Sequence, residues 1–259
     1  MVLCAARSSL CCGVWIRQLQ RRAHGGVYSG VHGFSHDEVR QKLEAFPGGS
    51  IDLLKQDSGL AVMTINNPSR MNAFSGSMMV DLEEKVTQLE NWTDGKSLIV
   101  CGAAETFCSG SDLNAVRAIS NPQDGMKMCM FMQNTLTRLL RLPLVSVAVV
   151  EGKAQNALKL LGGAVKVDSE LGLHMGLADG VLEDHQGAGG ADTVLQQAED
   201  WLSRFTRGPA PVIQAVKKVV LSGRELPLSE ALRTEKNVFG TVWGGAANLE
   251  ALASKSKHR

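Results

Sequence analysis

The middle of the chain alternates between segments with the two-residue hydrophobic period of strands and segments with the longer period of helices. Residues 50–68, SIDLLKQDSGLAVMTINNP, predict two strands around the turn Asp57-Ser58-Gly59, and Asn66-Asn67-Pro68 ends the second strand. A helix is predicted next, with Ser75 or Ser77 as its N-cap. Its apolar face consists of Met78, Met79, Leu82, Val86 and Leu89.

The alternation continues toward the centre of the chain. Residues 97–103 (SLIVCGA) predict a buried strand, residues 124–141 a helix, and residues 144–150 a strand that begins just after Pro143. The order strand, helix, strand, helix, strand predicts an α/β fold. The helix is expected to place four apolar side chains in line, namely Met128, Met132, Leu136 and Leu139.

Strand patterns are scarce in the C-terminal part. Residues 157–165 predict a helix, residues 176–182 a short strand and residues 183–192 a loop. Three more helices are predicted from their apolar faces. These faces are Leu195, Ala198, Leu202 and Phe205, then Val212, Ile213, Val216, Val219 and Val220, and finally Leu228, Leu232 and Phe239.

Composition narrows the classes of function. The 259 residues show no repeat and no domain boundary, and 44% hydrophobic with 20% charged residues is ordinary for a globular domain. A net charge of +1 gives no reason to expect a nucleic-acid partner. The apolar run Leu142–Val150 is too short to cross a membrane, so we expect no membrane span. The six cysteines contain no CxxC pair, which favours unlinked thiols over a metal site.

The N-terminal tail, residues 1–35, has a composition of its own. It contains four arginines and no acidic residue, with serine and apolar residues between them. This composition is typical of a mitochondrial transit peptide, although a disordered tail that lacks acids would read the same. Ordered structure is therefore expected to begin near His36, so that residues 36–259 form the folded domain.

Two loops are candidates for chemistry. In residues 106–116, TFCSGSDLNAV, Gly110 permits backbone conformations that other residues rarely adopt, and small serines flank it. Backbone N–H groups at such a turn can point at an anion or a polarised carbonyl, but a tight turn without a ligand has the same pattern. The second loop is residues 66–74, NNPSRMNAF, which follows a predicted strand and precedes a helix.

Together the loops resemble the enoyl-CoA hydratase/isomerase (crotonase) family. The matching signature is a strand, N-x-P-x-x-x-N-A, a helix, a second strand and then F-x-S-G-x-D-L. The resemblance extends from about Gly33 almost to the C-terminus. It implies a crotonase-like spiral of ββα units followed by C-terminal helices. We expect this fold to be incomplete in the present chain.

The expected incompleteness is an internal gap. In the family, the strand that matches residues 144–150 leads through G-x-A into a Gly-Gly-Gly turn and a helix. Here residues 151–154, EGKA, are present, but the residues after them resemble a segment much farther along. We therefore expect a missing block of several tens of residues, joined near Ala154-Gln155. Gly162-Gly163 matches a helix end and not the missing turn.

The resemblance also implies a substrate and a site. Crotonases act on acyl-CoA thioesters and hold the developing negative oxygen with two backbone N–H groups. One donor is the N–H of Ser111, and the other belongs to the missing glycine turn. The remaining implied substrate-binding residues are Arg70, Asn72 and Ala73 in the CoA-binding loop, with Ser109, Gly110, Asp112 and Leu113 around the donor. Asp112 and Leu113 are expected to order the turn rather than react.

The implied reaction follows from what the gap removes. Family hydratases use two glutamates as acid and base, and both would fall in the missing block. Decarboxylation needs only a held substrate carboxylate and a stabilised enolate. The resemblance therefore implies loss of CO2 from ethylmalonyl-CoA or methylmalonyl-CoA, giving butyryl-CoA or propionyl-CoA, as metabolite repair. No metal or organic cofactor is implied beyond coenzyme A in the substrate.

Two alternatives stay open at this point. With one donor of two, the chain is either a decarboxylase of reduced activity or a non-catalytic variant that associates with full-length subunits. The family forms trimers or hexamers, so a homo-oligomer is implied. The resemblance implies the cytosol, whereas the composition of the tail favours the mitochondrion.

Overall fold

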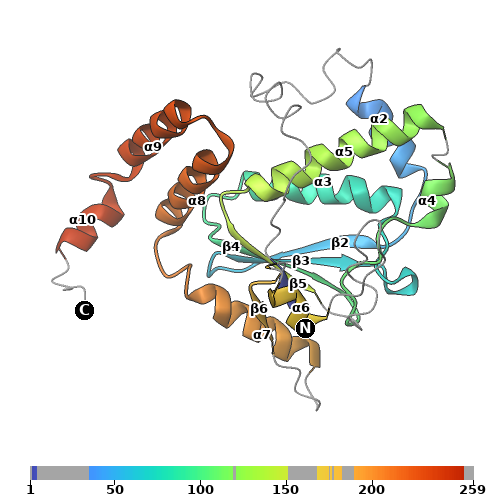
Figure 1. The fold of residues 1–259 in the computed structure, drawn as a ribbon, viewed down its shortest axis with the longest axis horizontal. Coiled ribbons are helices and arrows are strands. Elements are labelled where there is room, and N and C mark those ends of the chain that lie inside the picture. Colours follow the sequence, from blue (N-terminus) through green and yellow to red (C-terminus); the bar gives the residue numbers. More distant parts are fainter. Residues whose placement is uncertain are drawn as a thin grey trace.

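A mixed six-stranded sheet forms the centre of the computed structural model, in the order β2-β3-β4-β5-β1-β6. The structure describes residues 2–4, 35–118, 121–150, 168–174, 176, 178–182 and 190–253. Helices lie on both faces of this sheet, and three C-terminal helices extend to one side of it (Figure 1). The α/β fold expected from the sequence is confirmed.

The four strands predicted in the first half of the domain are confirmed. They are β2 (Ser50–Lys55), β3 (Leu60–Asn66), β4 (Ser97–Gly102) and β5 (Val145–Val150). β2 and β3 form an antiparallel hairpin, whereas β3, β4 and β5 run parallel to one another. Because parallel strands end at the same edge, the loops that follow β3 and β4 lie next to each other.

Two short strands complete the sheet. β1 (Val2–Cys4) runs antiparallel to β5, with Val2 opposite Val150, and also pairs with β6. β1 lies within residues 1–35, before His36, where ordered structure was expected to begin. The strand predicted at residues 176–182 is confirmed only as β6 (Gly180–Val181).

One face of the sheet is covered by α2 (His36–Glu44), α3 (Gly76–Glu90) and α5 (Pro122–Arg141) (Figure 1). Ser75 is the N-cap of α3, as predicted, because its Oγ accepts from the N–H of Met78 at 3.2 Å. The core on this face contains side chains of the strands, of α3 and of the segment before β5. Its buried members are Ile51, Ala61, Met63, Ile65, Met78, Leu82, Val86, Leu89, Leu98, Leu142 and Leu144.

The opposite face is covered by α6 (Ser169–His174) and α7 (Gly190–Ser203) (Figure 1). β4 shows how one strand serves both layers, since Leu98 belongs to the core beside α3 and Ile99 to the core beside α7. Both side chains are fully buried. This alternation follows from the two-residue period of a strand.

The sequence pattern missed α2. It is fixed by two buried residues, Val39 and Leu43, and by contacts with the buried carboxylate of Glu83 on α3. Glu83 lies 2.6 Å from His36 Nε2 and 3.1 Å from a guanidinium nitrogen of Arg40. These contacts join α2 to α3 across 40 or more residues of sequence, which no local pattern can indicate.

The apolar line predicted along α5 is only partly right. The fully buried residues of α5 are Phe131 and Thr135, whereas Leu136 is 48% exposed. Met132 and Leu139 are partly buried against the core beside α3, and Met128 packs on the cluster beside α2. The stripe that packs is therefore rotated relative to the predicted one, because α5 contacts α2 as well as α3.

The structure contains the three helices predicted in the C-terminal part and one more. α7, α8 (Ala210–Glu225) and α9 (Leu228–Val242) are confirmed, and α10 (Ala246–Ala253) was not predicted. The predicted apolar faces of α8 and α9 are largely exposed, although Ile213 of α8 is buried. The exposed fraction is 53–75% for Val216, Val220, Leu228, Leu232 and Phe239, and 54% for Phe205 beyond α7.

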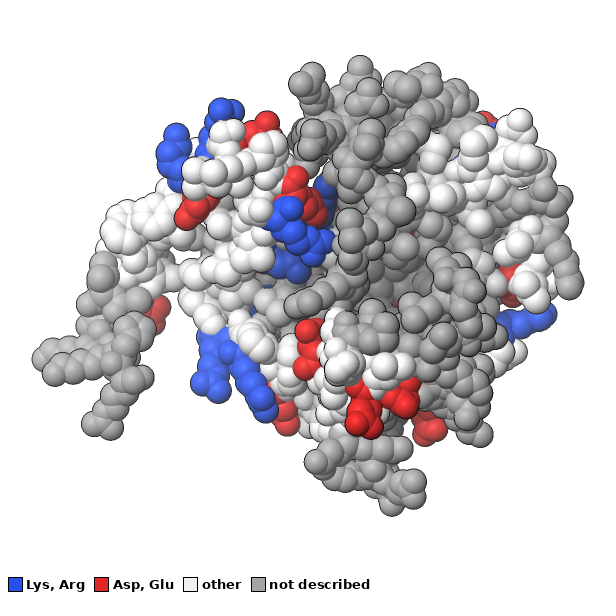
Figure 2. Space-filling view, in the orientation of Figure 1, with Lys and Arg blue, Asp and Glu red and all other residues white. Residues whose placement is uncertain are grey.

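Other expectations fall partly outside the described residues. The predicted helix at 157–165 lies outside them, as do residues 183–189 of the predicted loop, and α7 already begins at Gly190 within that loop. Among the described residues, no helix is long and apolar enough to span a membrane. Charged side chains of both signs are interspersed over the described residues on the face seen in Figure 2.

Leu98 provides a test of the central layer. We expect Leu98→Ala to lower the free energy of unfolding by about 2–5 kcal/mol, because it leaves a cavity between the sheet and α3. Leu54→Ala is the matched control, since Leu54 on the edge strand β2 is 62% exposed. Urea denaturation of both variants measures the difference, and equal losses would contradict the described core.

Candidate functional site

The candidate site is formed by two loops that follow neighbouring parallel strands. The first loop, residues 67–75, follows β3 and contains the short 3-10 helix η1 (Pro68–Arg70). The second loop, residues 103–112, follows β4 and leads into α4 (Leu113–Ala118). The sequence motifs singled out above therefore meet at one edge of the sheet.

Backbone hydrogen bonds fix the register of the two loops. The N–H of Ser109 donates to the carbonyl of Met71 at 3.0 Å. The N–H of Phe74 donates to Gly110 at 2.8 Å, and the N–H of Asp112 donates to the carbonyl of Phe74 at 2.8 Å. Phe74 and Ser111 thus form an isolated parallel β-bridge. The second loop therefore runs parallel to the first at this bridge, as two neighbouring strands would.

This register leaves the N–H of Ser111 available. Phe74 uses both of its main-chain groups on Gly110 and Asp112, so the N–H of Ser111 between them points the other way. In the part of the chain that the structure describes, this N–H has no acceptor, and Ser111 is exposed. An outward-facing amide is what a ligand oxygen requires.

Gly110 is needed for its backbone conformation. Its φ is +111°, and a Cβ added there would meet nothing within 4 Å. The neighbouring thiol of Cys108 accepts from the N–H of Gly110 at 3.3 Å. Burial raises the pKa of the Cys108 thiol, so it stays protonated at neutral pH and adds no negative charge beside the amide of Ser111.

The residues after Ser111 order the turn and surround it with apolar groups. Asp112 Oδ1 accepts from the N–H of Asn114 at 2.7 Å and so caps the start of α4. Leu113 is 65% exposed, and Val116 and Met71 also expose apolar side chains. Ser111 therefore lies next to a capped helix and to exposed apolar side chains.

The predicted residues of the first loop divide into exposed and buried ones. Arg70 is exposed, as is Ser109 across the loop, whose Oγ donates to the carbonyl of Arg70 at 3.2 Å. Asn72 and Ala73 are buried, and the carboxamide of Asn72 is hydrogen-bonded entirely to main-chain groups. In this structure the side chain of Asn72 faces the protein interior.

A cavity of about 460 Å³ adjoins the two loops. Arg70 and Asp112 line it, and the segment 45–49 between α2 and β2 forms another wall. The guanidinium of Arg70 has no ion pair within the described residues. Sequence reasoning missed the 45–49 wall, for which the turn residues Pro47-Gly48-Gly49 are the only local signal.

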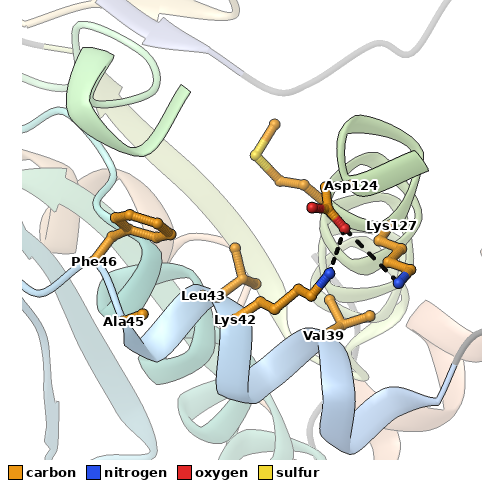
Figure 3. A pocket seen from close by; sticks show the side chains of 8 residues that line it. Val39, Lys42, Leu43, Ala45, Phe46, Asp124 and Lys127 are labelled. Atoms are coloured by element: carbon orange, nitrogen blue, oxygen red, sulfur yellow. Dashed lines mark hydrogen bonds and ion pairs between the residues drawn. The ribbon is translucent and has the colours of Figure 1, made fainter. Parts of the chain in front are cut away.

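A second cavity, of about 220 Å³, lies between α2 and α5 (Figure 3). Apolar side chains such as Leu43 and Phe46 line it, and Lys42, Asp124 and Lys127 stand at its rim. Lys42 Nζ lies 2.6 Å from Asp124 Oδ1. The hydrogen bond from Lys42 lowers the pKa of the Asp124 carboxyl, so these rim charges satisfy each other.

The described part of the site offers no set of metal ligands. Among residues within the described ranges, no group of three or more His, Cys, Asp or Glu side chains could hold a metal ion. Cys101, Cys108 and Cys129 form no disulfide. The chemistry that this site offers is therefore that of an exposed amide N–H, an exposed guanidinium and an adjoining cavity.

Comparisons with known proteins identify the family. The protein-family model described as enoyl-CoA hydratase/isomerase matches residues 55–165 of this chain. Proteins named ethylmalonyl-CoA decarboxylase are 50% identical in Gallus gallus, covering 93% of this chain and 95% of that protein, and 48% identical in Homo sapiens, covering 89% of both. This chain belongs to the enoyl-CoA hydratase/isomerase family.

Solved structures show the same fold. Pseudomonas aeruginosa AtuE aligns with a TM-score of 0.66 at 20% identity, covering 78% of this chain and 94% of that one. An enoyl-CoA hydratase from Mycobacterium smegmatis aligns with a TM-score of 0.67 at 16% identity, with the same coverage. The crotonase fold expected from the two motifs is confirmed.

The alignments show that relatives contain internal residues that this chain lacks. The alignment with the Rattus norvegicus protein runs over 300 positions, more than the 259 residues available here, yet covers 98% of this chain and 99% of that protein. That relative therefore carries internal residues without a counterpart in this chain. Such an excess is what the predicted missing block requires, and its location near Ala154-Gln155, outside the described residues, stays a prediction.

A pair of glycine substitutions tests the turn. We expect Gly110→Ala to lower the free energy of unfolding by about 1–3 kcal/mol, because alanine is strained at its positive φ. Gly125→Ala in α5 is the control: that site is equally open, and the change is expected to stabilise by about 0.5–1 kcal/mol. Thermal denaturation compares them, and a neutral Gly110→Ala would contradict the described turn.

Proposed function

We propose that this protein decarboxylates ethylmalonyl-CoA to butyryl-CoA, and methylmalonyl-CoA to propionyl-CoA, as metabolite repair. One observation carries the proposal: Ser111, within the family motif, is an exposed residue whose N–H has no acceptor among the described residues. Relatives about half identical to this chain are named ethylmalonyl-CoA decarboxylase, which supports the choice of substrate.

The proposed reaction needs an acceptor for an electron pair. The bond between the α-carbon and the carboxylate breaks, CO2 leaves, and the electron pair of that bond enters the thioester as an enolate. The N–H of Ser111 donates to the thioester oxygen, where the negative charge develops. A proton from water then adds to the α-carbon and gives butyryl-CoA.

The remaining proposed contacts follow from charge and exposure. Arg70 is an exposed guanidinium on the wall of the larger cavity, and guanidinium groups bind phosphate oxygens with paired hydrogen bonds. We assign it to a phosphate of coenzyme A, beside Ser109 and Gly110. Because amide donors stabilise the enolate, the proposed step uses no metal and no cofactor other than the coenzyme A of the substrate.

The missing block sets the expected rate. A second donor from the absent glycine turn would double the hydrogen bonding to the enolate oxygen, and losing one such donor costs about 10²–10³ in rate. Decarboxylation by this chain is therefore proposed to be slow. The block would also supply part of the wall around the acyl group.

An assembly and a location belong to the same proposal. The exposed apolar side chains of α8 and α9, with Trp243 at 64% exposure, support a homo-oligomer, a trimer or a hexamer, in which these helices are covered. We propose the cytosol as its location. The acid-free N-terminal tail instead supports the mitochondrion, and cell fractionation distinguishes the two.

Two substitutions at Ser111 test the donor. Ser111→Pro deletes the N–H, so release of labelled CO2 from ethylmalonyl-CoA should fall about 10²–10³-fold. Ser111→Ala keeps the N–H and is expected to retain the wild-type rate within a few-fold. Equal rates in the proline and wild-type proteins would contradict the assigned role of this amide.

Restoring the missing block tests the second donor. A version with the block inserted after Ala154 should decarboxylate ethylmalonyl-CoA about 10²–10³ times faster than this chain, because it regains the second N–H. Comparable rates would show that the block is not needed. An active restored protein beside a chain with no activity would instead favour the non-catalytic alternative.

A further inference from the structure

The strain of the site's backbone is concentrated in the two loops that hold Ser111. Among the described residues, the non-glycine residues with positive φ are Met71, Asn72, Ala104 and Glu105, at 51–55°. The first two lie in the loop after β3 and the other two in the loop after β4. Such conformations persist only where the surrounding structure fixes them.

One side chain connects the two strained segments. The carboxamide nitrogen of Asn72 donates to the carbonyl of Ala103 at 2.8 Å and also to the carbonyl of Thr106. These two carbonyls stand on either side of the left-handed pair Ala104 and Glu105. The carboxamide thus closes the strained turn at both ends.

The other end of the carboxamide holds its own loop. Asn72 Oδ1 accepts from the N–H of Asn67 at 2.8 Å, and the N–H of Asn72 donates to the carbonyl of Asn67 at 2.9 Å. The side chain of Asn72 therefore uses its oxygen and its nitrogen within the protein. Its residue is 0% exposed, so no face of it remains for a substrate.

From this anchor the chain reaches Ser111 within a few residues on each loop. Phe74, two residues after Asn72, forms the bridge with Ser111, and the second loop runs from Thr106 to the same bridge. The start of the second loop is tightly packed, because a Cβ on Gly102 would lie 1.8 Å from the carbonyl oxygen of Thr106.

The geometry points to Asn72 as a positioning residue that sets the direction of the Ser111 N–H without touching the substrate. This inference rests on the proposed function, because it gives Asn72 a role in aiming the amide that stabilises the enolate. It differs from a role in substrate binding, which would require an exposed carboxamide.

Two variants separate the carboxamide from the backbone. Asn72→Gly accepts the left-handed φ and removes all three side-chain hydrogen bonds. Asn72→Asp keeps an oxygen toward Asn67 but places the other oxygen against the carbonyls of Ala103 and Thr106. The control is Asn91→Ala, which removes a carboxamide at the end of α3 that donates to the carbonyl of Thr87 at 2.8 Å, away from both loops.

The measurements use butyryl-CoA, the product of the proposed reaction, labelled with 13C at the thioester carbonyl. We expect the hydrogen-exchange rates of residues 106–112 to rise about 10-fold or more in both Asn72 variants. The reason is that both variants lose the two hydrogen bonds from Asn72 to the carbonyls of Ala103 and Thr106. The downfield shift of the bound carbonyl should fall by half or more, while the Kd stays within about 3-fold. Asn91→Ala should match the wild type in all three measurements.

The outcomes are distinct. A carbonyl shift equal to that of the wild type in both Asn72 variants would overturn the inference. A Kd about 10-fold higher with unchanged hydrogen exchange would also overturn it, because that result indicates a direct contact between Asn72 and the ligand. If the wild-type protein leaves the 13C shift of the bound butyryl-CoA carbonyl unchanged, the proposed role of Ser111 is contradicted. The hydrogen-exchange rates would then still decide whether Asn72 holds the loop.

A third variant covers the case in which Asn72 variants do not fold. Gly102→Ala forces Thr106 away from Asn72 while leaving the carboxamide in place. We expect it to reproduce the faster exchange and the reduced carbonyl shift. A folded Gly102→Ala protein with the exchange rates and carbonyl shift of the wild type would contradict the inference.

Discussion

The site depends on the β-bridge between Phe74 and Ser111. Two loops that are far apart in sequence become one surface because Phe74 donates to Gly110 and accepts from Asp112. The same bonds direct the intervening N–H of Ser111 outward. Without this register the motif would be an ordinary turn, and no main-chain donor would be presented to a thioester.

The bridge in turn depends on the sheet and on local backbone strain. β3 and β4 are parallel neighbours, so the loops leave the same edge, and core residues such as Leu98 fix the strands there. Gly110 permits the turn, while Asn72 holds the strained segments of both loops. Stability of the central layer and direction of the amide are therefore linked through a short path.

Local sequence patterns were sufficient for the strands β2 to β5 and for α3, because their periodicity and turn residues act within a few positions. They were insufficient for α2, which is held by Glu83 of α3, and for β1. On α8 and α9 the periodicity indicated an apolar face correctly but not what covers it, and residues such as Leu228 are exposed. A pattern along one helix contains no information about its partner.

The candidate site was predicted to a similar degree. The motifs located the amide of Ser111, but they could not tell that Asn72 is buried, since that depends on carbonyls of the other loop. The wall at residues 45–49 was missed for the same reason. The longer alignments with relatives agree with a missing internal block, whose position the described residues do not include.

A structure of this protein with butyryl-CoA bound tests the central claim most directly. The account predicts that the thioester oxygen lies about 2.7–3.1 Å from the backbone nitrogen of Ser111, the distance of a donor aimed at developing charge. A thioester oxygen bound elsewhere, with the Ser111 amide facing solvent, would contradict it.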